Sequence, residues 1–131
     1  ARALVEAETV RWSNVKVIYG HTDSIFCLCR GRSKEQAFKI GRAIAKAVTD
    51  SNPPDVELKF EYVFTSCIFS SINRYVGYHW EDEDQRRPTF LAKGVEIVTR
   101  NQCMATAKMQ GIALRKLLKG RDVSMVKDFV C

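Results

Sequence analysis

The pattern of apolar and polar positions in the first half of the chain predicts a β-hairpin followed by a helix. Two short apolar runs, Val15–Tyr19 and Ile25–Cys29, flank a polar stretch that contains Gly20, which is typical of two strands joined by a tight turn. Ser33 is a good N-cap. After it, apolar side chains recur at helical spacing until about Asp50, where a Ser-Asn-Pro-Pro stretch ends the helix.

The second half of the chain contains further strand and helix patterns. Residues 56–62 alternate apolar and charged side chains, which predicts a strand. The other predicted elements are a helix at residues 1–12, strands near 64–69, 74–80 and 90–98, a helix over 102–119 that Asn101 caps and Gly120 ends, and a short helix through Phe129 that Asp122 caps. This order predicts an α+β fold.

Length and composition limit the possibilities. A chain of 131 residues that is 46% hydrophobic can bury one modest core. It has no run of about 18 apolar residues, so no membrane span is expected. It also lacks a secretory signal, which favours a soluble intracellular segment. Because the first residue is Ala rather than Met, we expect a chain that was processed or excised from something longer.

The five cysteines predict no zinc site. Cys27 and Cys29 would share one face of a strand, but no second close pair completes a set of four ligands. We therefore expect the cysteines to be reduced and mostly buried, where they act as small apolar side chains.

Charge is concentrated in two segments. Residues 85–121 contain nine basic side chains and a single acidic one, an excess that suits a polyanion such as a nucleic acid backbone. A solvated helix face explains the same composition equally well. The acidic run at 81–84 lacks the ordered spacing of a cation site and predicts a solvated turn.

The hairpin carries a motif with a known counterpart. The six residues Tyr19-Gly20-His21-Thr22-Asp23-Ser24 resemble the Tyr-Gly-Asp-Thr-Asp-Ser metal-binding motif of family B DNA polymerases at five positions, the exception being His21. Ser33–Gly41, Leu58–Glu61, Arg74–Tyr78 and Lys93–Glu96 resemble later signatures of that family in the same order. The second helix and the Lys-Gly-Val-Glu stretch are most similar to the zeta-type branch, which performs translesion synthesis.

The resemblance implies an antiparallel palm-type sheet with packed helices that leads into a helical thumb base. Residues 1–98 would form the C-terminal half of the palm, and residues 99–131 the start of the thumb. It also implies a nuclear DNA-directed DNA polymerase in DNA replication and repair. Its partners would be primer-template DNA, deoxynucleoside triphosphates and accessory subunits.

The resemblance further implies a metal site at the hairpin. Nucleotidyl transfer uses two divalent ions, and hard ions such as Mg²⁺ prefer carboxylate ligands. Asp23 matches the acidic position that binds the ions, whereas His21 occupies the other acidic position and is degenerate. Gly20, Thr22 and Ser24 match the turn. An imidazole could instead bind a softer ion such as Zn²⁺ or Mn²⁺. This chain lacks the family's earlier metal-binding strand, so we do not expect it to polymerise alone.

Four residues match family positions that contact DNA: Arg74, Tyr75, Lys93 and Arg100. The alternative is that they are surface residues of strands and helices without a role in DNA binding.

Other family positions are altered. Ile72 and Asn73 replace two lysines that grip DNA, and Asn101 replaces an acid. These changes leave two further hypotheses open besides an active polymerase. One is a catalytically inactive polymerase-like domain that serves as a scaffold or DNA-binding module. The other is a basic nucleic-acid module unrelated to polymerases.

Overall fold

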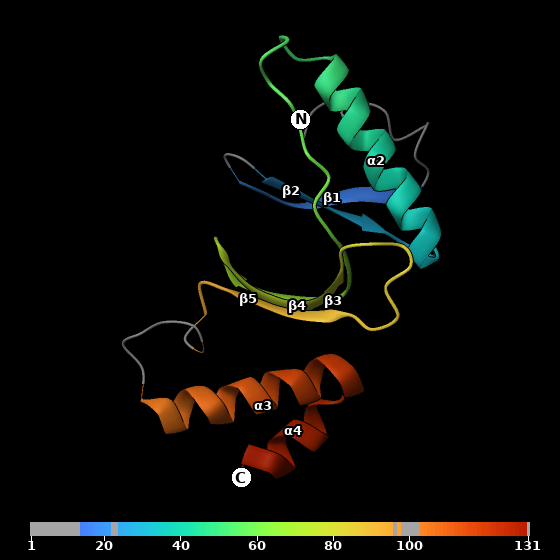
Figure 1. The fold of residues 1–131 in the computed structure, drawn as a ribbon. Coiled ribbons are helices and arrows are strands. Elements are labelled where there is room, and N and C mark those ends of the chain that lie inside the picture. Colours follow the sequence, from blue (N-terminus) through green and yellow to red (C-terminus); the bar gives the residue numbers. More distant parts are fainter. Residues whose placement is uncertain (1–13, 22–23, 96, 98–102, 131) are drawn as a thin grey trace. The chain divides into compact units, whose positions relative to one another are not determined.

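The structure, a computed structural model, describes residues 14–21, 24–95, 97 and 103–130. The elements are β1 (Val15–His21), β2 (Ser24–Cys29), α2 (Lys34–Asp50), β3 (Val63–Ser71), β4 (Arg74–Trp80), β5 (Thr89–Lys93), α3 (Met104–Gly120) and α4 (Val123–Val130). Figure 1 shows them along the chain. The α+β class is confirmed. The helix predicted at residues 1–12 lies outside the described residues.

The chain divides into two compact units. The first comprises the residues up to Val63 together with Glu81–Asp84, and the second comprises Phe64–Trp80 with the residues from Gln85 onward. The first unit contains the β1–β2 hairpin and α2, whereas the second contains the antiparallel sheet β3-β4-β5 with α3 and α4. No helix among the described residues is long and apolar enough to cross a membrane.

The core of the first unit lies between α2 and one face of the hairpin. Val15 and Val17 of β1 and Ile44 and Val48 of α2 are buried together. Partly buried apolar side chains complete this core: Ile25, Cys27, Cys29, Ile40, Ala47 and Leu58. The apolar side chains that alternate along the strand and those that recur along the helix therefore pack together at one interface, as the sequence predicts.

The start of α2 follows the predicted capping pattern. The Ser33 side chain accepts a hydrogen bond from the Gln36 backbone N–H at 3.3 Å, and the Gln36 side chain accepts one from the Ser33 N–H at 3.2 Å. This reciprocal pair is a capping box, which satisfies two N–H groups that the helix leaves unpaired.

We expect Ser33→Ala to lower the free energy of unfolding by about 1 kcal/mol, because the side-chain acceptor of the cap is lost. Urea denaturation followed by circular dichroism measures the change. Ser70→Ala, at an exposed strand position, is the control and should change stability by less than about 0.5 kcal/mol. Equal effects of the two substitutions would contradict a role for the cap.

The strand predicted at 56–62 is wrong, since these residues form no strand and join neither sheet of the described part of the chain. Leu58 instead exchanges both backbone hydrogen bonds with one side chain: its N–H donates to Thr49 Oγ1 at 3.0 Å, and its carbonyl accepts from that hydroxyl at 3.4 Å. Phe60 packs edge-on against Phe38 at 5.6 Å between ring centroids. Leu58 and Phe60 thus pack inward without a β-ladder, whereas Val56 and Tyr62 stay exposed.

The acidic run is only partly a solvated turn. Glu81, Asp82 and Asp84 are exposed, but Glu83 accepts a hydrogen bond from Arg42 of α2 at 2.8 Å. The Lys34 ammonium donates to the backbone carbonyl of Glu83. An exposed ion pair of this kind contributes less than about 1 kcal/mol, so it fixes the position of the loop more than it stabilises the fold.

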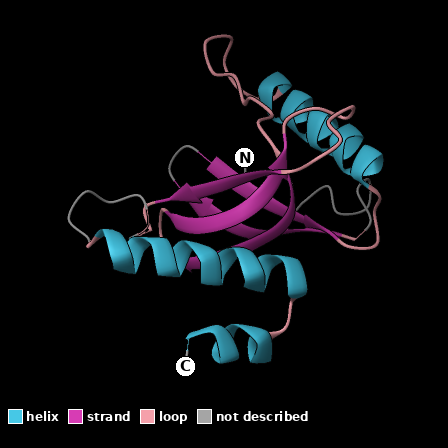
Figure 2. Ribbon diagram, turned by 60° about the horizontal axis from the view of Figure 1, so that its bottom comes forward, coloured by secondary structure: helices cyan, strands magenta, loops and turns pink. Residues whose placement is uncertain are grey.

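In the second unit, α3 runs along one face of the three-stranded sheet and α4 folds back beside it (Figure 2). Two cations help to hold these helices. The Arg115 guanidinium lies 4.5 Å from the centre of the Phe90 ring in β5, and the Lys116 ammonium lies 4.2 Å from that of Phe129 in α4. Part of the basic segment therefore packs against aromatic rings.

The end of α3 differs from the prediction. α3 includes Gly120, and Arg121 takes the left-handed conformation that ends it, at φ 52°, while its N–H donates to the Leu117 carbonyl. The next helix begins as expected, since Asp122 accepts a hydrogen bond from the Ser124 N–H at 2.8 Å. Asn101, the predicted cap of α3, lies outside the described residues.

The predicted strand 90–98 ends early. β5 stops at Lys93, because Gly94 has a φ of 64° and turns the chain out of the extended conformation.

The four cysteines that the structure describes are free, as predicted, but not uniformly buried. Cys27, Cys29 and Cys67 are partly buried, whereas Cys103 is exposed. Burial raises the pKa of Cys27 and of Cys67 to about 11, so both stay protonated near neutral pH. They behave as small apolar side chains, while Cys131 lies outside the described residues.

Candidate functional site

The β1–β2 hairpin presents the first group of candidate residues. Its antiparallel register closes on the pair His21 and Ser24, which leaves Thr22 and Asp23 as the two residues that connect the strands. Those two lie outside the described residues. His21 is exposed at the end of β1. The paired strands predicted on either side of the motif are therefore confirmed.

Gly20 has a different place from the one expected. It lies within β1 and pairs with Ile25, so it belongs to the ladder rather than to the turn. A Cβ atom at Gly20 would meet Ile25 at 3.9 Å, an ordinary contact, and the fold does not require glycine there. Ser24 likewise lies in a strand, as the first residue of β2.

Two features shape the strands next to the tip. The Tyr19 and Phe26 rings pack edge-on across the two strands, with centroids 5.4 Å apart. The register shifts by one residue between Val17 and Tyr19, which marks a β-bulge. Bulges bend a strand and increase its local twist.

The donors at the tip only partly suit a divalent ion. His21 offers an imidazole nitrogen where a hard ion prefers carboxylate oxygen. Among the described residues, no three His, Cys, Asp or Glu side chains are grouped so as to hold a metal ion. A two-metal site would therefore need carboxylates beyond those that this part of the chain offers.

A second group of candidates meets at one end of the β3-β4-β5 sheet. Tyr75 at the start of β4 is paired with Lys93 at the end of β5. The Lys93 ammonium lies 5.9 Å from the centre of the Tyr75 ring. A Cβ atom at Gly94 would lie 2.3 Å from the Asn73 carbonyl oxygen and 3.2 Å from the Arg74 side chain, so only glycine fits. The Arg-Tyr and Lys-Gly signatures, distant in sequence, thus form one surface.

Within this surface the two cations and the tyrosine differ in exposure. Arg74 and Lys93 are exposed. Tyr75 is 9% exposed, and its ring packs against Phe64 at 6.2 Å and Phe69 at 5.8 Å. The ring therefore supports the sheet beneath Lys93, whereas the two cations face solvent. Arg100, the fourth candidate, lies outside the described residues.

The β3–β4 turn lies beside these cations. It consists of Ile72 and Asn73. Ile72 is 68% exposed, and Asn73 takes a φ of 58°, a conformation that asparagine tolerates better than most residues. The positions where lysines would add charge thus form an uncharged turn.

In the sequence, nothing distinguishes Lys119 and Arg121 from the other basic residues of segment 85–121. The structure brings both next to Ser66 and Tyr78, residues of β3 and β4. The high number of basic residues in this segment indicates a basic surface, but it does not show which of these side chains lie together.

Comparisons with known proteins agree with the motif. The family model for DNA polymerase family B matches residues 2–130. The chain is 47% identical over 123 residues, or 94% of its length, to the DNA polymerase zeta catalytic subunit of Homo sapiens. It is 41% identical over 117 residues, or 89% of its length, to the zeta catalytic subunit of Saccharomyces cerevisiae.

A related subunit is more distant. The identity is 35% over 117 residues, or 89% of the chain, to the DNA polymerase delta catalytic subunit of Caenorhabditis elegans. The chain spans 4% of the human zeta subunit, 8% of the yeast one and 11% of the worm delta subunit. The ordered signatures, the paired strands around the motif and the match along nearly the whole chain lead to one conclusion: the chain belongs to DNA polymerase family B and is similar to zeta catalytic subunits.

Proposed function

We propose that the chain is the part of a zeta-type DNA-directed DNA polymerase that carries one metal-ligating carboxylate, Asp23, and part of the primer-template surface. The observation that carries the proposal is the register that closes on His21 and Ser24. It supports a motif at the tip of two rigidly paired strands, the arrangement that a preorganised site needs. Residues 1–98 would belong to the palm and residues 99–131 to the thumb base.

In this proposal, Asp23 helps to bind two Mg²⁺ ions together with carboxylates outside this chain. Such ions activate the primer hydroxyl and hold the triphosphate. Gly20, Thr22 and Ser24 would support the hairpin, and His21 would stand where the family has an acid. Arg74, Lys93 and Arg100 would bind phosphates of the duplex, with the Tyr75 ring beneath Lys93. The whole protein would act in translesion synthesis in the nucleus, with accessory subunits.

Primer extension by the longest natural polypeptide that contains this sequence tests the proposal, with Mg²⁺ and Mn²⁺ supplied separately. We expect Asp23→Ala to lower the rate at least about a thousandfold, which corresponds to roughly 4 kcal/mol of lost transition-state stabilisation. Asp55→Ala removes the same charge at an exposed loop position and is the control. Activity that survives Asp23→Ala would rule out the hairpin as the catalytic site.

A second candidate function is an inactive polymerase-like domain that acts as a scaffold or binds DNA. The observation in its favour is the exposed, uncharged Ile72–Asn73 turn beside Arg74, together with His21 in the motif. In the same assay, absence of extension with either ion in the unaltered protein, with DNA binding retained, would favour this candidate.

A further inference from the structure

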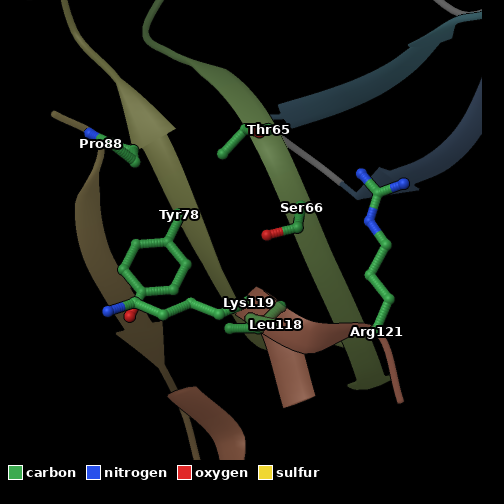
Figure 3. Close-up of a pocket in the computed structure, with 7 residues that line it drawn as sticks. All are labelled: Thr65, Ser66, Tyr78, Pro88, Leu118, Lys119 and Arg121. Carbon is green, nitrogen blue, oxygen red and sulfur yellow. The ribbon is translucent and has the colours of Figure 1, made fainter. Parts of the chain in front are cut away.

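A shallow pocket lies within the second unit, between the sheet and the end of α3 (Figure 3). Its volume is about 230 Å³, and Leu118 contributes to its lining. A neighbouring hollow of about 400 Å³ shares Ser66, Leu118 and Arg121 with it. The two hollows together form an open groove along β3, which we call the β3–α3 groove.

The polar groups of the pocket are those that bind oxyanions. Three hydroxyl side chains (Thr65, Ser66 and Tyr78) and two cations (Lys119 and Arg121) line it, and none of the described lining residues is a carboxylate. In Figure 3, Lys119 extends beside Tyr78 on one side of β3 and Arg121 lies on the other, with Ser66 between them and Thr65 farther along the strand. Hydroxyl groups and cations are the side chains that most often contact phosphate oxygens.

The backbone at the end of α3 holds one cation in an unusual position. Glycine commonly takes the left-handed conformation that ends a helix, but here Arg121 takes it, directly after Gly120. A residue with a side chain is strained there, and such strain is concentrated at functional sites. The adjacent Asp122 is not among the residues that line the pocket. Its carboxylate instead caps α4.

We propose that the β3–α3 groove binds phosphates of a nucleic-acid backbone through Lys119 and Arg121, with the Ser66 and Thr65 hydroxyl groups as further donors. This contact is separate from the one at Arg74 and Lys93, which lies at the start of β4 and the end of β5. The identity of the polyanion rests on the proposed function, whereas the anion-binding character rests on the lining of the groove. A purely structural explanation exists, because cations near a helix C-terminus also offset its partial negative charge.

Salt-dependent DNA binding separates these explanations. Fluorescence anisotropy would measure the Kd of the longest natural polypeptide for primer-template and for single-stranded DNA between 50 and 200 mM salt. Each lost phosphate contact lowers the slope of log K against log salt by about 0.9 for duplex DNA. For Lys119→Gln with Arg121→Gln we expect the slope to fall by roughly 2. Raising the salt over this range should then weaken DNA binding by the double variant about tenfold less than binding by the unaltered protein. Lys119→Arg should keep the unaltered slope.

Lys108→Gln with Lys127→Gln is the matched control. Both lysines are exposed on α3 and α4, and neither lines the groove. A slope for the Lys119 and Arg121 double variant equal to that of this control would overturn the inference. If the Lys119 and Arg121 double variant loses affinity only for single-stranded DNA, the groove binds a single-stranded portion of the substrate, and the inference stands.

The proposed function and the groove can fail independently. If the unaltered protein binds neither DNA, the proposed function fails, and thermal unfolding in inorganic phosphate against chloride then tests the groove alone. A ligand that binds the folded state raises Tm. A phosphate-dependent rise that the Lys119 and Arg121 double variant loses and the control keeps would support an oxyanion site. Equal shifts in the two would overturn it.

Discussion

Replacing His21 with aspartate is expected to raise the rate of nucleotide incorporation by about tenfold or more in the longest natural polypeptide that contains this sequence. The proposed site assembles two dications, and a carboxylate at this position would restore a negative charge beside them. At about 4 Å and an effective dielectric constant near 20, one unit charge contributes roughly 4 kcal/mol. His21 is exposed, so solvent screens part of this energy, but a tenfold change needs only about 1.4 kcal/mol.

Steady-state primer extension in Mg²⁺ and in Mn²⁺ measures this effect. His21→Asn is the matched control, because it changes size in a similar way without adding charge, and it should not raise the rate. If aspartate and asparagine give the same rate in both ions, charge at position 21 does not limit catalysis.

The second large effect is expected at Gly77, in the middle of β4. A Cβ atom there would lie 2.5 Å from the Ser66 backbone oxygen and 2.8 Å from the Phe64 ring. Neither can retreat easily, because Gly77 is buried and both neighbours belong to the adjacent strand β3. Gly77→Ala should therefore lower the free energy of unfolding by about 3 kcal/mol, at the upper end for overpacked cores.

Urea denaturation compares this variant with Gly20→Ala, which also adds one methyl group to a strand. The new Cβ at Gly20 would make only an ordinary contact of 3.9 Å, so we expect a change of less than about 1 kcal/mol. A similar loss at both positions would show that the close approach of β3 and β4 does not determine the requirement for glycine.

Local signals predicted the hairpin and α2 of the first unit well. The hairpin and α2 follow from alternation, from the capping residues at Ser33 and from the prolines after Asp50, because each of these acts within a few residues. The segment 56–62 failed for the opposite reason. Its alternation is real, but a strand needs a partner, and here the hydroxyl of Thr49 takes the hydrogen bonds of Leu58.

The candidate site was predictable where a motif lies in one segment. The hairpin around His21 is an example. The groove was not predictable, because it depends on how α3 lies against β3, which brings Arg121 beside Ser66. Charge counts likewise gave no indication that Arg115 and Lys116 pack against rings.

The bulge between Val17 and Tyr19 determines which face of the hairpin carries Tyr19 and His21. Along an uninterrupted strand, every second side chain lies on the same face. Tyr19 and His21 would then face α2, as Val15 and Val17 do. The extra residue, Ile18, reverses the alternation of side chains between the two faces. Tyr19 therefore pairs with Phe26, and His21 with Ser24, and these side chains lie on the face away from the helix. The outward orientation of His21 is therefore encoded by one unpaired residue, and losing that residue would turn the side chain into the core.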